Sequence, residues 1–375
     1  MKKIIYRNIA QDCTKFFLLA LFTISIIIWV LQAVNYLDFV TEDGHGFFVY
    51  FNYTLLSFPR IFSRIFPFAV FLTFTYIILK YENKNELVIF WNFGIEKIHF
   101  INFFIKFSFL FVLVSLFLNT IIAPYSQDKA RSFIRSSDLD FFESMLKPKK
   151  FIDIIENLTI YFDEKNENGE LINIFLNDKS GQSSQITFAK NGKIENRENR
   201  KILVLQEGVT INEINGQISK LTFFKTDFNI SQFSTKTTVT KKIQETSTKT
   251  LLKCFIFFHK FEDEIDFSSI QLDRNCDAKN LKNVNQEIYS RLIKPLYNTF
   301  LITISLLLIL KSKNNQTFNT NKIKIYSLGF ISIIFVELSS KFVNTNLIQN
   351  IILAMMPIFF LMITYLFILK SLKKN

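Results

Sequence analysis

The sequence is poor in the residues that build nucleotide and metal sites. Its 375 residues include nine glycines, three histidines and three cysteines. It contains no G-x-x-x-x-G-K-[ST] loop, no H-E-x-x-H pair, no G-x-S-x-G turn and no glycine-rich dinucleotide loop. His45, His99 and His259 are widely separated, and no Cys/His spacing matches a metal site. We therefore expect no catalytic residue, no metal and no bound cofactor, and predict that the chain is not an enzyme.

Charge is nearly absent from six apolar runs, each close to the length that crosses a hydrocarbon core. Three of them precede residue 123 or so and three follow residue 288 or so. The runs are Phe16 to Val34, Ile61 to Leu79, Phe107 to Ala123, Pro295 to Leu310 with a helical extension back to Ile288, Ile325 to Ser340, and Phe342 to Leu369. The sequence thus predicts a membrane protein with a three-plus-three helix arrangement.

The polar middle of the chain is typical of β-structure. Six segments are rich in β-branched and aromatic residues: 158–163, 171–177, 185–190, 201–206, 209–214 and 218–230. Asn-Gly pairs at 168–169, 191–192 and 215–216 favour hairpin turns. We expect an inserted antiparallel domain, either a β-sandwich, a jelly roll or an open variant. Along the chain this divides helices one to three (1–123), the β domain with its return linker (124–287) and helices four to six (288–375). The domain could alternatively be only a spacer.

The return linker and the cysteines leave alternatives open. Residues 251–261 are apolar and could dock on the sheet or on the membrane surface, and the course of 251–287 is not predicted. Cys254 and Cys276 either form a disulfide or remain two thiols. Cys13 is expected to be a free thiol.

Lys and Arg residues predict the orientation in the membrane. Residues 1–15, 80–97, 311–324 and 370–375 hold fourteen Lys or Arg and only four acids. The loop 35–59 holds three acids and no cation. Both termini are therefore expected in the cytoplasm and the β domain outside it. This distribution also explains most of the net charge of +12, so nucleic acid is not expected as a partner.

The second cytoplasmic loop combines an acid, an apolar helical turn and a glycine. Glu86 precedes Leu87, Ile89, Phe90 and Phe93, and Gly94 can end a helix in the left-handed region. This pattern predicts a short amphipathic helix at the membrane surface. It could bind a soluble partner or simply lie in the interface.

Four segments in this order resemble the permease subunits of the lipopolysaccharide exporter, the LptF/LptG family. They are Ile65-Phe66-Pro67-Phe68-Ala69, the loop from Asn85-Glu86-Leu87-Val88 to Gly94-Ile95, the stretch Asn119 to Pro124, and Glu287 to Leu296 with the sequence EIYSRLIKPL. The resemblance covers nearly the whole chain. The stretch 31–39 lacks the basic cluster that G-type members tend to carry, so the F type is favoured.

The resemblance implies one subunit of a heterodimeric ABC transporter in the bacterial inner membrane. It implies a second homologous permease, a cytoplasmic ABC ATPase dimer that hydrolyses ATP, and a membrane-anchored periplasmic β-bridge protein leading toward the outer membrane. Lipopolysaccharide would be extracted from the outer leaflet, with spans one and five as gates. Glu86, Leu87, Ile89, Phe90, Phe93 and Gly94 would couple the permease to the ATPase.

Several cations near the outer ends of the spans could hold lipid phosphates, because charge at that depth must pair or face water. The candidates are Arg60, Arg64, Lys129, Arg131, Arg135 and Lys341. Alternatively they are snorkelling anchors, and Lys341 pairs with Glu337 at i,i+4.

Two other classes of function remain open at this point. One is an ABC-type permease for another lipid or a lipoprotein. The other is a membrane sensor with an outer ligand-binding domain, which would require a larger cytoplasmic output segment than the sequence contains.

Overall fold

The computed structural model describes residues 2–37, 47–145, 148–155, 158–166, 169–179, 183–197, 200–214, 217–229, 241–260, 276 and 280–374. Two compact units are present. The first comprises residues 1–32, 56–129 and 242–375, and the second comprises 33–55 and 130–241. The return segment from residue 242 onward thus belongs to the same unit as the membrane helices. The sequence-based division had grouped residues 124–287, including this segment, with the β domain.

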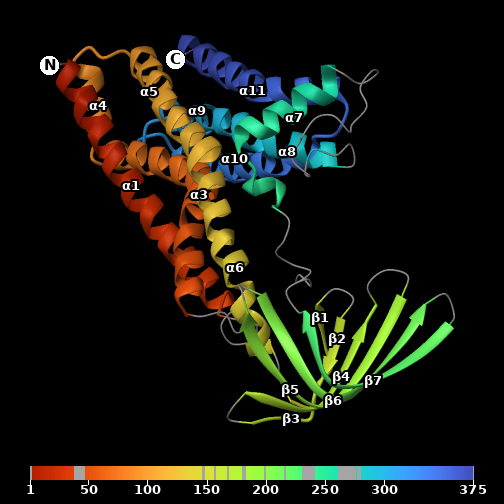
Figure 1. Ribbon diagram of the computed structural model, residues 1–375. Helices are drawn as coiled ribbons and strands as arrows, with labels where there is room; N and C mark the ends of the chain where they lie inside the picture. Colours follow the sequence, from red (N-terminus) through yellow and green to blue (C-terminus); the bar gives the residue numbers. More distant parts are fainter. Residues whose placement is uncertain are drawn as a thin grey trace. The chain divides into compact units, whose positions relative to one another are not determined.

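Six helical segments are long and apolar enough to cross a membrane, which confirms the predicted number of spans (Figure 1). Their helices are α1 (Lys2–Asn35), α3 (Phe47–Asn83), α5 (Lys97–Phe117), α8 with α9 (Leu281–Leu292 and Tyr297–Leu306), α10 (Phe318–Ser339) and α11 (Leu347–Lys374). The third span continues through a π-helical turn, η1 (Leu118–Ile122), into α6 (Ala123–Met145). The short helix α4 (Glu86–Asn92) joins α3 to α5, and α7 (Thr248–Lys260) precedes α8.

The fourth span is two helices and not the single helix that the sequence suggested. A 3-10 turn, η5 (Lys294–Leu296), separates α8 from α9, because Pro295 has no N–H to donate to a continuous helix. Every residue of α9 is buried, and it packs against α5, α10 and α11. Interhelical hydroxyl pairs hold it there: Thr75 with Ser305 (3.0 Å), Ser108 with Thr299 (3.1 Å) and Thr303 with Thr364 (3.0 Å). Such pairs stabilise helix association where lipid supplies no hydrophobic drive.

The inserted domain is an antiparallel meander in one sheet, the open variant of the expected β fold. The strands are β1 (Ile152–Ile155), β2 (Leu158–Tyr161), β3 (Glu164–Lys165), β4 (Glu170–Asp178), β5 (Ser183–Arg197), β6 (Arg200–Ile214) and β7 (Gln217–Asn229). Their order is β1-β2-β4-β5-β6-β7, with β3 paired to β4 (Figure 1). Buried aliphatic and aromatic side chains, among them Leu158, Ile160, Phe162 and Leu205, form the core of one face.

Two predictions about the turns and strands were wrong. The pair Asn191-Gly192 lies inside β5, where a Cβ on Gly192 would come within 2.4 Å of the Ile174 side chain. The segments 201–206 and 209–214 form the single strand β6. Gly169 does lie in a turn, with φ +76°. Asn168 and the pair at 215–216 lie outside the described residues.

A bend crosses the middle of the sheet without any change of register. Asn173 (φ 54°) and Glu207 (φ 47°) have left-handed backbones, and both stand in the row of residues that includes Lys190. In β4 the buried residues stand at odd-numbered positions before this row, as Leu171 does, and at even-numbered positions after it, as Ile174 does. Lys190 Nζ donates to the Glu207 carboxylate at 2.8 Å, and this hydrogen bond raises the pKa of Lys190. The bend lets both halves of the long strands bury one continuous face.

Candidate functional site

The helix α4 has well-defined ends. Asn85, with φ 60°, reverses the chain after α3 and precedes Glu86. At the other end the Gly94 N–H donates to the Trp91 carbonyl at 3.0 Å and the Ile95 N–H to the Phe90 carbonyl at 3.2 Å. This is the Schellman pattern, and the φ of +73° at Gly94 is the left-handed conformation that it requires. The helix termination expected at Gly94 is therefore present.

The two faces of α4 differ from the sequence-based assignment. Leu87 is 1% exposed and packs into the helical core, and Phe90 lies against Tyr81 and Phe100. Both side chains therefore support the bundle, because i and i+3 positions share one face of a helix. The outer face carries three exposed apolar side chains: Val88 (40%), Ile89 (47%) and Phe93 (59%). Val88 was not among the predicted contact residues, because the apolar face was assigned to its neighbour Leu87.

Hydrogen bonds from other segments hold the base of α4. Glu82 is 6% exposed, and its carboxylate accepts from the Lys313 backbone N–H at 2.7 Å. Lys313 Nζ donates to the Asn83 carbonyl at 3.0 Å. Asp12 on α1 accepts from Lys80 Nζ at 3.3 Å. The exposed apolar face of α4 thus rests on a support built from three segments of the chain.

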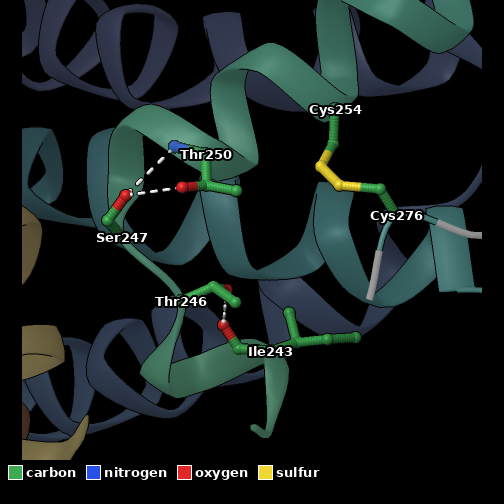
Figure 2. The surroundings of a disulfide bond; sticks show 6 residues. All are labelled: Ile243, Thr246, Ser247, Thr250, Cys254 and Cys276. Carbon is green, nitrogen blue, oxygen red and sulfur yellow. Dashed lines mark hydrogen bonds between the residues drawn. A yellow bond between two sulfur atoms is a disulfide. The ribbon is translucent and has the colours of Figure 1, made fainter. Parts of the chain in front are cut away.

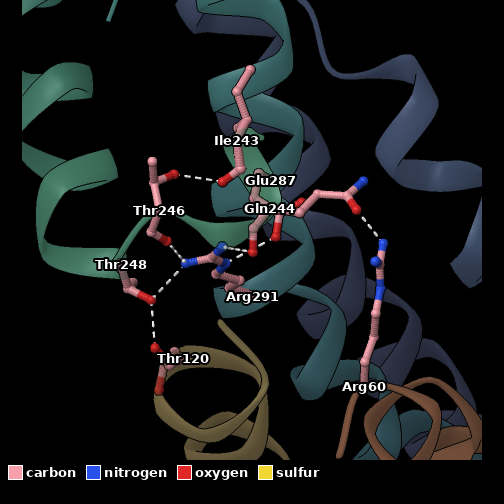
Figure 3. Close-up of polar contacts among 8 residues, drawn as sticks. All are labelled: Arg60, Thr120, Ile243, Gln244, Thr246, Thr248, Glu287 and Arg291. Carbon is pink, nitrogen blue, oxygen red and sulfur yellow. Dashed lines mark hydrogen bonds and ion pairs between the residues drawn. The ribbon is translucent and has the colours of Figure 1, made fainter. Parts of the chain in front are cut away.

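A second polar site surrounds Arg291 on α8, a residue that is 2% exposed (Figure 3). Its guanidinium donates four hydrogen bonds, to the Glu287 carboxylate (2.9 Å), the Thr246 carbonyl (2.9 Å), the Thr248 hydroxyl (3.0 Å) and the Gln244 carbonyl (3.0 Å). A buried cation is tolerated when it is paired and its donors are satisfied. Sequence reasoning gave Arg291 no role, although its i,i+4 spacing from Glu287 was a usable signal.

The same site continues to α3 and η1. Thr248 Oγ1 donates to the Thr120 carbonyl in the π turn at 2.6 Å. Arg60 on α3 donates to the Gln244 side chain. It also donates to the side-chain oxygen of Gln127, at 2.7 Å from Nε and 3.0 Å from Nη1, with the Gln127 amide oriented so that this oxygen faces Arg60. We call this set the arginine junction: Arg60, Thr120, Gln127, Gln244, Thr246, Thr248, Glu287 and Arg291. Figure 3 shows all of these residues except Gln127.

The arginine junction belongs entirely to the first compact unit and includes residues near two of its ends in sequence. Two of the unit boundaries fall at 129/130 and 241/242, and Gln127 and Gln244 each stand two residues from the end residue of the first unit, Lys129 or Lys242. Arg60 binds both of these amides. The outgoing and returning chain are therefore tied to each other and to spans two and four.

The predicted phosphate-binding cations are placed separately. Arg60 and Arg64 lie one turn apart on α3, with Arg64 exposed, and Lys129 and Lys341 are exposed. Arg131 is half-buried on α6. The side chain of Arg135 lies outside the described residues. The suggested pair of Lys341 with Glu337 is not formed, because Glu337 binds Lys294.

Within the residues that the structure describes, no group of three or more His, Cys, Asp or Glu side chains is arranged to hold a metal ion. The absence of metals and cofactors from this chain stays a prediction.

Comparison with known proteins places the chain beside a family and a relative. A family model described as lipopolysaccharide export system permease LptF/LptG matches residues 7–371. The chain is also similar to a protein of Rickettsia prowazekii (strain Madrid E) named "Uncharacterized protein RP871". The two are 23% identical over 297 residues, which is 77% of each chain.

Proposed function

The chain belongs to the lipopolysaccharide export system permease family LptF/LptG, and we propose that it is one half of a transporter driven by a separate cytoplasmic ATPase. As a member it is a multi-pass permease of the inner membrane and not an enzyme. In our proposal it takes lipopolysaccharide from the outer leaflet and passes it to its own β domain. A membrane-anchored periplasmic β-bridge protein then receives it.

The observation that carries this proposal is the outer face of α4. Val88, Ile89 and Phe93 form an exposed apolar surface at the end of the helical bundle. Covering apolar surface contributes about 25 cal/mol per Å² removed from water, so such a face favours a protein partner. Glu86 in the first turn adds a charge that a basic residue of the ATPase can meet. A rigid base under α4 would pass a push from the ATPase to α1, α3 and the loop at Lys313.

The arginine junction would receive this movement at the other end of spans two, three and four. Arg60 and Arg291 bind the segments that lead into and out of the β domain. A shift of α3 relative to α8 would therefore pull on both connections together. We propose that this is how helix movement reaches the β domain.

Lipid phosphates would be held by the cations of α3. Arg64 is exposed on a helix of membrane length, where an unpaired charge is costly. Arg60 lies one turn before Arg64 on the same helix and donates to the side chains of Gln244 and Gln127. Lys129, Arg131, Arg135 and Lys341 remain further candidates for substrate contact.

The remaining partners follow from the family and from the sheet. The second homologous permease would pair with this chain, which we assign to the F type. Strand β7 ends the strand order, and its Ile218, Leu221 and Phe224 are 60–80% exposed. An edge strand can accept a further strand, as a continuing β-bridge requires.

Co-purification from native membranes tests the proposal. The tagged chain should recover an ABC ATPase and a second six-span permease. Glu86→Arg and Ile89→Asp should each lose the ATPase and keep the permease. Glu96→Arg is the matched control, because it reverses an exposed charge in the same loop but lies outside α4. Recovery of no ATPase with the unaltered chain, or equal recovery with all variants, would contradict the coupling role of α4.

A further inference from the structure

Two cysteines join α7 to the segment that precedes α8. Cys254 and Cys276 form a disulfide with Cα atoms 5.6 Å apart and a sequence separation of 22 (Figure 2). Cys254 is 1% exposed and packs with Leu251 and Val284, so it belongs to the contact between α7 and α8. The third cysteine, Cys13, is a buried free thiol in α1.

The disulfide restrains the helix that carries part of the arginine junction. Thr248, which binds Arg291 and Thr120, begins α7, and Cys254 lies six residues further along the same helix. The N-terminal end of α7 is therefore held by hydrogen bonds and its middle by a covalent bond. The helix α7 packs on α8.

We propose that Cys254 and Cys276 are a redox modification site whose oxidation clamps α7 onto α8 and so keeps the arginine junction assembled. The site is oxidised by disulfide exchange with a thiol oxidoreductase outside the cytoplasm. The two thiols lose two protons and two electrons as the S–S bond forms, and the disulfide of the oxidoreductase is reduced to a dithiol. The inference rests on the outward orientation of this segment, which is part of the proposed function, because such bonds persist in oxidising compartments.

In the reduced protein, α7 would be held only by hydrogen bonds and by the small apolar contact of Leu251 and Cys254 with Val284. The polar contacts of Thr246 and Thr248 with Arg291 would then compete with water whenever α7 lifts from α8. We expect reduced protein to open at α7 more often, with loss of the tie between the returning chain and span four.

Alkylation of the protein in native membranes tests the redox state. After denaturation in maleimide-polyethylene glycol, the unaltered chain should gain one adduct, on Cys13, and three adducts after prior reduction. Cys13→Ser should gain none before reduction and two after it. Three adducts without reduction would overturn the proposal.

Variants then test what the bond does. Cys254→Ser, Cys276→Ser and the double variant should show the same several-fold increase in tryptic cleavage at Lys249 and Lys253 of α7, because each lacks the same bond. Cys13→Ser is the matched control and should leave cleavage unchanged. Unchanged cleavage in all three variants would overturn the clamping role. If the thiols are oxidised but no ATPase co-purifies, the disulfide stands and the transporter proposal fails.

Discussion

At the scale of single residues, Arg291 holds more of the molecule together than any feature of its local sequence indicates. It joins α8 to three residues of the returning chain and also pairs with Glu287 one turn earlier in α8. All of these bonds use the fixed fork geometry of a guanidinium, which an ammonium cannot reproduce. Its function is therefore tied to arginine and not merely to positive charge.

Replacing Arg291 should destabilise the protein strongly. Arg291→Met leaves the Glu287 carboxylate and two carbonyls without their donor, and the loss should be about 3 kcal/mol or more. Arg291→Lys should lose less, because it keeps the charge but satisfies fewer acceptors. Thermal unfolding of the purified protein in detergent measures both. The control is Arg64→Met, which removes the exposed arginine side chain of α3 that lies outside the arginine junction. An equal shift for Arg64→Met and Arg291→Met would contradict the role of the junction.

At the scale of secondary-structure elements, one glycine sets how closely two spans approach. A Cβ on Gly329 of α10 would lie 1.9 Å from the Phe71 ring on α3. Phe71 itself is 2% exposed and belongs to the helical core. Small residues allow helices in membranes to pack at short distance, and here the partner of the glycine is an aromatic ring.

Gly329→Ala should therefore force α10 away from α3. Overpacking of this kind costs about 1–3 kcal/mol, and the unfolding temperature should fall accordingly. Shortening the opposing side chain in Gly329→Ala/Phe71→Leu should recover part of the loss, whereas Phe71→Leu alone should lower stability by creating a cavity. If the loss of stability in the double variant equals the sum of the losses in the two single variants, the steric explanation is wrong.

At the scale of the whole molecule, the charge distribution predicts which side of the membrane each unit faces. The basic loop that contains Asn314 should be cytoplasmic, and the β domain that contains Lys220 should lie outside. Both side chains are exposed.

A membrane-impermeant maleimide should distinguish these positions in intact cells with a permeabilised outer envelope. In a Cys13→Ser background, Lys220→Cys should be labelled and Asn314→Cys protected until the inner membrane is opened. The oxidised Cys254 and Cys276 do not react. Labelling of Asn314→Cys in intact cells would reverse the orientation and exclude the proposed ATPase contact at α4.

Part of the candidate site could be read from the sequence. The surface helix at Glu86 and its termination at Gly94 were predictable because capping and amphipathic spacing are local. The division of its faces was not, since Leu87 becomes buried and Phe90 partly buried only when α4 packs into the helical core. The same reason hides Arg291, whose partners Gln244, Thr246 and Thr248 are more than forty residues away.

The sequence by itself determined the six spans, the inserted antiparallel domain and the family, because membrane length, strand alternation and motif order are written along the chain. Only the tertiary structure decided which cations are paired, that Cys254 meets Cys276, and that β6 is one bent strand. These outcomes depend on which distant segments come into contact. A pairing energy exists only after the helices and strands have packed, so no local pattern encodes it.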